Sequence, residues 1–90
     1  MVEIVTLNGD VILNREQLHG ILAVQLELPA WYGGNLDALM DCLTDLNRDV
    51  HIHIVSYNKL EEHLESYAAR LLQVLRRAEK ENSHLTLTVD

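Results

Sequence analysis

The residue types best suited to chemistry are concentrated in the segment WYGGNLDALMDCLTD, residues 31–45. It contains the chain's single tryptophan, its single cysteine and three aspartates four residues apart, Asp37, Asp41 and Asp45. Side chains at this spacing lie on one face of a helix. Such a row of carboxylates can bind basic groups, and together with histidine it can hold a metal ion or serve in acid–base catalysis.

The segment also has the pattern of a two-sided helix. Asn35 is a good N-cap, and Gly34 before it allows a sharp turn. At about 100° per residue, the apolar and the polar side chains separate into two arcs. The apolar arc contains Leu36, Leu39, Met40, Leu43 and Leu46, and the polar arc contains Asp37, Asp41, Thr44 and Asp45. We expect the first arc to be buried and the second to be presented.

Helix stability accounts for only part of the polar arc. A carboxylate at Asp37 is favoured by the helix dipole, because it lies in the first turn. Asp41 and Asp45 lie towards the other end, where the dipole disfavours anions, and each like-charged pair four residues apart costs about 0.2–0.5 kcal/mol. The arc is either a plain solvated surface or an acidic surface kept for function, and the spacing leaves both readings open.

Two large aromatic residues, Trp31 and Tyr32, precede this helix in a loop with two glycines. They can plug the core or anchor an interface, since Trp and Tyr are enriched among binding hot spots. Adjacent side chains rarely point the same way. We therefore expect one of the two residues in each role.

The charge balance limits the kind of partner. The 90-residue chain has 14 Asp and Glu against 7 Lys and Arg, and its formal net charge is −7. Nucleic-acid binding depends on clustered Lys and Arg, so we expect no nucleic-acid partner. The acidity suits a basic protein partner, or it simply keeps the protein in solution.

Length and composition predict one domain, residues 1–90, in a reducing compartment. No apolar run approaches the ~20 residues of a membrane span, and the first ten residues lack a signal-peptide pattern. A lone cysteine excludes an internal disulfide framework. We expect a cytoplasmic protein that does not bind a membrane.

A catalytic or metal-binding interpretation would combine Asp37 and Asp41 with His51 or His53. Two histidines two positions apart on a strand are more often packed or solvated, and no third ligand follows at metal-site spacing. No glycine-rich phosphate loop or nucleophile motif is present. Cys42 is a poor nucleophile candidate, because neighbouring acids would raise its pKa. We expect no enzyme activity, no metal and no cofactor.

The order of the elements predicts an α/β domain. Strands are expected at 2–7, 50–55 and 85–89, and stretches with a helical period separate them. The first helical stripe is Leu18, Ile21, Leu22 and Leu26, and the longest is Ala68, Leu71, Leu72, Leu75 and Ala78. Pro29 ends the first of these helices. Strands separated by helices favour a small parallel sheet with right-handed crossovers.

Capping signals predict where three of the helices begin. Asn14 is a good N-cap, with Gln17 in the reciprocal capping-box position. Asn58 and Glu61 have the same spacing and predict the start of a short helix. Ser66 is the candidate cap of the longest helix.

Two further signals concern chain reversals. Asn82 is a plausible left-handed terminator of the longest helix. The pair Asn8-Gly9 is a hairpin signal, so residues 10–13 could pair back on the first strand. A helix start follows at once, and the hairpin stays an open alternative.

The segment LPAWYGGNLDALMDCLTD, residues 28–45, resembles the signature of the barstar family, intracellular inhibitors of small guanyl-specific ribonucleases such as barnase. The similarity extends through LLQVLRRAEKEN (71–82) into LTLTV (85–89), and so covers most of the chain. The family fold is α/β, a small three-stranded parallel sheet packed with about four helices. It agrees with the element order predicted above.

The resemblance implies that the second helix and the loop before it block the ribonuclease active site. Asp41 would be the central group, its carboxylate standing in for a substrate phosphate among Arg and His side chains of the enzyme. Asp37 would pair with further basic groups, and Trp31 replaces a family tyrosine that packs on the catalytic histidine. The implied partner-binding set is Trp31, Gly33, Asn35, Leu36, Asp37, Met40, Asp41, Thr44, Asp45 and Glu81.

The resemblance also implies the partner, a basic extracellular-type ribonuclease, with this chain a monomer when free. The chain departs from the best-known family pattern, which has tryptophan at Met40 and Leu46, glutamate at Gly34 and glycine at Asp45. An acidic contact residue is replaced by Arg77, so the target is expected to differ from barnase itself. The alternative is an acidic interaction module, or an antitoxin-like protein, for a different basic partner.

Overall fold

The computed structural model describes all residues, 1–90, and contains one three-stranded parallel sheet and four helices. The elements are β1 (Glu3–Asn8), α1 (Arg15–Gln25), α2 (Leu36–Thr44), β2 (Val50–Val55), α3 (Tyr57–Leu64), α4 (Ser66–Glu81) and β3 (Leu85–Val89). The predicted α/β fold with a small parallel sheet is confirmed.

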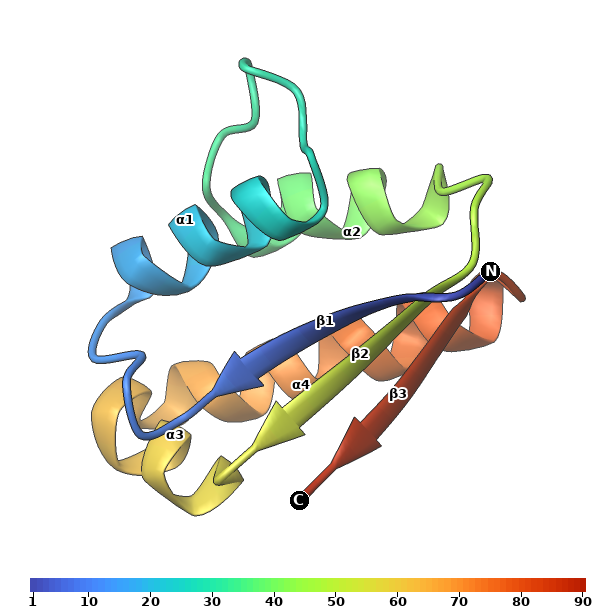
Figure 1. Ribbon diagram of the computed structural model, residues 1–90. Helices are drawn as coiled ribbons and strands as arrows, with labels where there is room; N and C mark the ends of the chain where they lie inside the picture. Colours follow the sequence, from blue (N-terminus) through green and yellow to red (C-terminus); the bar gives the residue numbers. More distant parts are fainter.

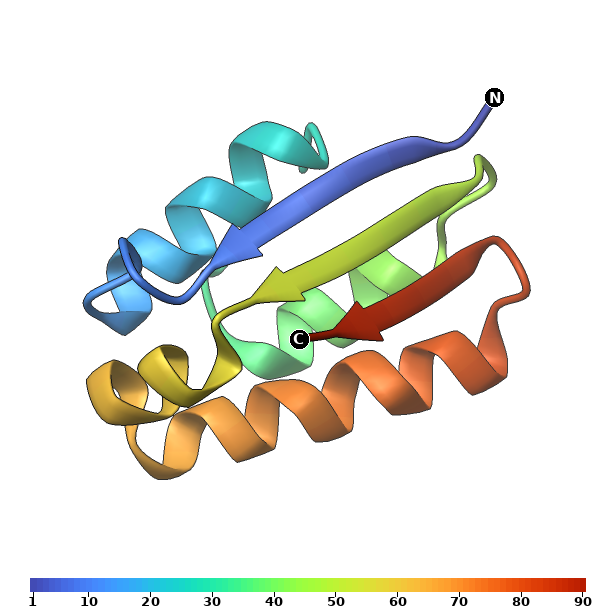
Figure 2. The ribbon, with the colours of Figure 1, turned by 60° about the horizontal axis from the view of Figure 1, so that its bottom comes forward.

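The sheet has one covered face and one open face. In the central strand β2, Ile52 and Ile54 are fully buried, whereas His51 and His53 between them are partly exposed. Figure 2 looks onto the sheet with α2 behind it, α1 beside β1 and α4 beside β3. The odd and even positions of each strand therefore face two different environments, the helical layer and solvent.

The core is one cluster of 20 buried apolar residues. It joins all three strands to all four helices, with Leu39 of α2 and Leu71 of α4 among its fully buried members. Burial of a leucine side chain is worth about 1.5–3 kcal/mol, so this cluster fixes the helices on the sheet.

The helices α1, α2 and α4 run against the direction of the strands, as crossovers between parallel strands require (Figure 1). Their N-terminal ends therefore lie towards the edge of the sheet at which the strands end (Figure 1). None of the four helices has the length and apolar composition that crossing a bilayer needs.

The possible hairpin at Asn8-Gly9 is wrong. β1 pairs in parallel with β2, and residues 10–13 form no strand. The Asn8 side chain accepts a hydrogen bond from the backbone N–H of Asp10, at 2.9 Å, which turns the chain towards α1. A Cβ atom on Gly9 would lie 2.2 Å from the carbonyl oxygen of Ser56, so glycine is required here by a close approach and not by a hairpin turn.

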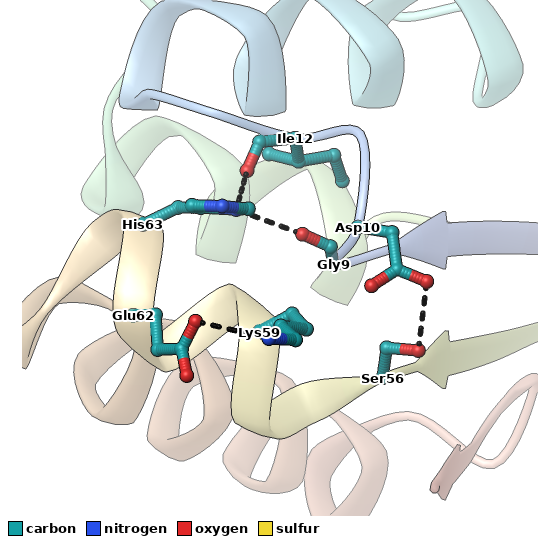
Figure 3. A network of polar contacts seen from close by, with 7 residues as sticks. All are labelled: Gly9, Asp10, Ile12, Ser56, Lys59, Glu62 and His63. Carbon is teal, nitrogen blue, oxygen red and sulfur yellow. Dashed lines mark hydrogen bonds and ion pairs between the residues drawn. The ribbon is translucent and has the colours of Figure 1, made fainter.

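Polar contacts tie this turn to α3 and to Ser56 just before it (Figure 3). His63 Nδ1 donates to the carbonyl oxygens of Gly9, at 2.9 Å, and Ile12, at 3.1 Å. The Ser56 hydroxyl donates to a carboxylate oxygen of Asp10, at 3.2 Å. These contacts hold the β1–α1 connection against α3. Residues 10–13 therefore do not fold back to pair with β1.

Of the predicted caps outside α2, Asn14 is correct, whereas Asn58 and Ser66 are not. Asn14 caps α1 as predicted, since its side chain accepts from the backbone N–H of Gln17. α3 is preceded by Ser56 in the left-handed region, φ 57°, and Asn58 lies inside the helix. Glu65, φ 56°, precedes α4, so Ser66 is its first residue and not its cap. Both residues have a positive φ, a conformation that no capping box in the sequence specifies.

Candidate functional site

The helix α2 is fixed at its N-terminus as the sequence predicts. Asn35 has extended backbone angles, and its side chain accepts from the N–H of Ala38 at 2.8 Å. Gly34 has a φ of +67°, the left-handed conformation that favours glycine. The sharp turn before α2 is therefore confirmed.

The C-terminus of α2 is held by a residue that sequence reasoning misplaced. Asn82 is extended, φ −134° and ψ 110°, so it is not a left-handed terminator. It is 8% exposed, and its Nδ2 donates to the carbonyl oxygens of Leu43, at 2.9 Å, and Leu46, at 3.0 Å. Carbonyl oxygens in the last turn of a helix lack N–H donors within that helix. The Asn82 side chain, at the end of α4, provides a donor at the end of α2.

The apolar arc of α2 faces the core. Leu36, Leu39 and Leu43 are buried, and Met40 and Leu46 are partly buried against the core cluster. The predicted two-sided helix is thus confirmed. Because Leu36 is only 8% exposed, its side chain packs inside the protein and offers little open surface.

The three aspartates of the polar arc, Asp37, Asp41 and Asp45, are exposed and have no ion-pair partner within the chain. Thr44 differs, because its hydroxyl donates to the carbonyl oxygens of Met40 and Asp41 within the helix. Its oxygen remains able to accept a hydrogen bond from outside.

The loop before α2 shows the predicted division between its two aromatics. Trp31 is 79% exposed, whereas Tyr32 is partly buried against the core. The Tyr32 hydroxyl lies 2.5 Å from His19 Nδ1, and His19 Nε2 lies 2.7 Å from the hydroxyl of Tyr67 on α4. One nitrogen of the buried imidazole donates and the other accepts, so a chain of three side chains anchors the loop to α1 and α4.

Burial sets the protonation states in this chain of side chains. It raises the pKa of Tyr32 to about 12, with smaller contributions from Cys42 and Tyr67. Burial also lowers the pKa of His19. At neutral pH both groups are therefore neutral, which is the pairing that lets the tyrosine hydroxyl and the imidazole exchange hydrogen bonds.

A hollow lies at each end of α2. The one near its C-terminal end, about 210 Å³, is lined by Trp31, Cys42 and Asp45 among others. The one at its N-terminal end, about 280 Å³, is shared with α1 and α4 and lined in part by Arg15, Asp37 and Arg70. The exposed aspartates are therefore flanked by two concave surfaces.

Comparison with known proteins agrees with this geometry. The family model described as "Barstar (barnase inhibitor)" matches residues 2–89. The chain belongs to the barstar family. A relative from Bacillus subtilis (strain 168), named "Putative ribonuclease inhibitor YrdF", is 35% identical over 78 residues, which are 86% of this chain and 86% of the relative. Membership of the barstar family supports a role as a ribonuclease inhibitor, and not as an enzyme.

In this barstar-family chain the sheet separates the histidines of β2 from α2. His51 and His53 lie on the open face, on the side of β2 away from the buried Ile52. No group of three or more His, Cys, Asp or Glu side chains has an arrangement that could hold a metal ion. The structure therefore does not bring Asp37 and Asp41 together with these histidines, because alternate residues of a strand point to opposite faces.

Cys42 is partly buried on α2. Burial raises the pKa of its thiol, and the charges of Asp41 and Asp45 raise it further, as the sequence predicts. A thiol that stays protonated is a poor nucleophile. Cys42 thus contributes to the wall of a hollow and offers no reactive group.

The remaining residues of the implied set lie around α2. Gly33 and Asn35 are exposed in the loop before it, although the Asn35 side chain is used by the cap. Glu81 is exposed at the end of α4 and lies 3.6 Å from Arg77. That arginine therefore has an internal partner, which reduces the charge it presents.

Proposed function

We propose that this chain inhibits a small, basic, guanyl-specific ribonuclease of the barnase type by placing α2 and the preceding loop in its active site. In this proposal the carboxylate of Asp41, at the middle of the polar arc, occupies the position of a substrate phosphate. Asp37 and Asp45 pair with flanking basic groups. The chain acts as a monomer in the cytoplasm on an enzyme of the extracellular type.

The observation that carries the proposal is the row of unpaired carboxylates on α2. Asp37, Asp41 and Asp45 are exposed and have no ion-pair partner in the chain. Their mutual repulsion costs the free helix about 0.2–0.5 kcal/mol per pair. A basic active site removes this cost and supplies charge-assisted hydrogen bonds, which are short and strong.

The loop supports the same proposal. Trp31 is 79% exposed, yet its neighbour Tyr32 is hydrogen-bonded to the buried His19. The loop backbone is therefore anchored beside an unburied aromatic side chain, as expected for an interface hot spot. Trp31 can pack on an imidazole or guanidinium group of the enzyme, and the hollow next to it can receive a neighbouring side chain.

The decisive experiment is a titration of guanyl-specific ribonucleases with the purified protein. We expect near-stoichiometric inhibition of at least one such enzyme, and a loss of several kcal/mol of binding free energy for Asp41→Ala. Hot-spot measurements include an aspartate of a barstar-family inhibitor, so this magnitude is carried over from the family. The control is Glu61→Ala, which removes an exposed carboxylate from α3 and should cost less than about 0.5 kcal/mol.

Absence of inhibition and of binding across the panel at micromolar concentration would refute the proposal. An Asp41→Ala effect no larger than that of Glu61→Ala would place the centre of the interface elsewhere. If the chain instead binds an unrelated basic protein through α2, the acidic surface is that of a general interaction module.

A further inference from the structure

The N-terminal ends of α1, α2 and α4 meet at one corner of the molecule. We call it the basic corner and define it by Arg15, Tyr67 and Arg70. Arg15 is the first residue of α1, and Tyr67 and Arg70 lie in the first two turns of α4. Together with Asp37 and the start of α2 they line the hollow of about 280 Å³. Figure 1 shows the N-terminal ends of these three helices on the same side of the molecule.

Both arginines lie against the ring of Tyr67. The guanidinium carbon of Arg15 lies 4.3 Å from the centre of the Tyr67 ring, and that of Arg70 lies 5.5 Å from it. Tyr67 is itself fixed, because it is 5% exposed and its hydroxyl is bonded to His19. Stacking uses the flat face of a guanidinium and leaves its N–H groups free at the edge.

No group in the chain uses those N–H donors. Arg15 and Arg70 take part in no ion pair, whereas Arg48 and Arg77 pair with Glu3 and Glu81. The helix dipole disfavours a cation at the first residue of α1, and two neighbouring cations repel each other. The contacts with Tyr67 do not remove this repulsion, and an anion supplied from outside would.

The corner is continuous with the proposed inhibitory face. Asp37, the first aspartate of the polar arc, lines the same hollow as both arginines. α2 and α4 lie side by side, since they share this hollow at one end and the Asn82 hydrogen bonds at the other. A group that binds the corner therefore belongs to the molecule that covers α2.

We infer that Arg15 and Arg70 form a second contact of the inhibitory face, which receives an Asp or Glu carboxylate at the rim of the ribonuclease active site. The inference rests on the proposed function and adds a requirement for its target. A basic enzyme must carry an acidic side chain beside its phosphate-binding groups in order to match both α2 and the corner. An enzyme with a basic rim is rejected.

A carboxylate suits the corner better than an RNA phosphate. The planar fork of arginine binds a carboxylate through two parallel hydrogen bonds. A nucleic acid would bring a row of phosphates against Asp37 and against a chain of net charge −7. A single rim carboxylate brings one negative charge to the two arginines and Asp37, where a row of phosphates would bring several.

The test is charge reversal at the corner, measured with the ribonuclease that the wild type inhibits most strongly. Arg15→Glu and Arg70→Glu are each expected to raise the dissociation constant about tenfold or more. Arg76→Glu makes the same charge change at an exposed position of α4 outside the hollow, and should cost less than about threefold. Arg70→Lys keeps the charge without the planar fork, so an intermediate loss is expected.

Each result decides the inference. Equal effects of Arg70→Glu and Arg76→Glu, tighter binding by Arg70→Glu, or a lower free energy of unfolding with unchanged affinity would each overturn it. Binding of an oligoribonucleotide to the free chain that Arg70→Glu abolishes would also overturn it, in favour of a phosphate site.

Asp41→Ala in the same assay separates this inference from the proposed function. If Asp41→Ala abolishes binding while both corner variants behave like Arg76→Glu, α2 is the inhibitory element and the second contact is wrong. If no ribonuclease is bound, both fail together.

Discussion

The two faces of the molecule treat polar side chains in opposite ways. On the open face of the sheet, His51 lies within hydrogen-bond distance of Thr86 and Thr88, at 2.7 and 2.8 Å, and His53 pairs with Asp90. On the helical face, the carboxylates of α2 have no ion-pair partner in the chain. The two faces lie on opposite sides of the sheet that contains β2.

This difference distinguishes a surface whose polar groups are paired within the chain from a surface whose charges have no partner in the chain. A polar group whose partner lies in the same chain gains little from a second molecule. An exposed charge on a fixed helix has no internal ion pair to lose when a partner binds, so its whole interaction energy with the partner contributes to binding. The comparison therefore supports the proposal that a partner binds the helical face. Variants that change the scaffold and the charges of that face can test it.

The largest effect on stability is expected at Asn82, which holds the end of α2. Asn82→Ala removes the side-chain donor to the carbonyl oxygens of Leu43, which is buried, and Leu46, which is partly buried. We expect the free energy of unfolding to fall by about 2–4 kcal/mol in urea denaturation. Asn47→Ala, an exposed asparagine in the loop before β2, is the matched control and should change it by less than about 0.5 kcal/mol. Equal effects of the two variants would show that α2 is held by its apolar arc alone.

The pH dependence of stability tests the anchor of the aromatic loop. Burial lowers the pKa of His19, so below the ordinary histidine pKa of about 6.5 the unfolded chain binds a proton that the folded chain resists. The free energy of unfolding should therefore fall as the pH drops from 7 to 5, and fall less in His19→Gln. An unchanged slope in His19→Gln would show that the imidazole is not the titrating group.

Sequence patterns predicted the parts of this molecule that depend on neighbouring residues. The period of α2, its cap at Asn35 and the opposite exposure of Trp31 and Tyr32 all follow from local spacing. The strand and helix order gave the parallel sheet. The family resemblance implied the full set of partner-binding residues. Local spacing alone predicted only an exposed acidic arc on α2.

The remaining features depend on contacts between distant segments. Asn82 contacts residues 36 and 39 positions earlier in the chain, and a left-handed terminator was the only reading its local sequence offered. The basic corner combines Arg15 with Tyr67 and Arg70, which become neighbours only when α1 and α4 pack together. The glycine of Asn8-Gly9 is needed by the approach of α3, which a hairpin rule does not consider.

Replacing an aspartate by lysine is expected to have a smaller effect on the free energy of unfolding, and the effect should differ between the two faces. Asp45 lies at the C-terminal end of α2, four residues from Asp41, so Asp45→Lys should raise the free energy of unfolding by about 0.5 kcal/mol while weakening ribonuclease binding. Asp90→Lys removes the partner of His53 and should give no gain in stability. Denaturation and binding assays on the two variants check this. A loss of stability in Asp45→Lys would mean that the carboxylate is already stabilised within the fold.

The central claim is tested most directly by the affinity of two single variants, one from each face, for the ribonuclease that the wild type inhibits most strongly. Asp41→Ala on α2 is expected to lose several kcal/mol of binding free energy, and His53→Ala on the sheet less than about 0.5 kcal/mol. The reverse result, a large loss for His53→Ala with Asp41→Ala close to wild type, would contradict the assignment of binding to the helical face.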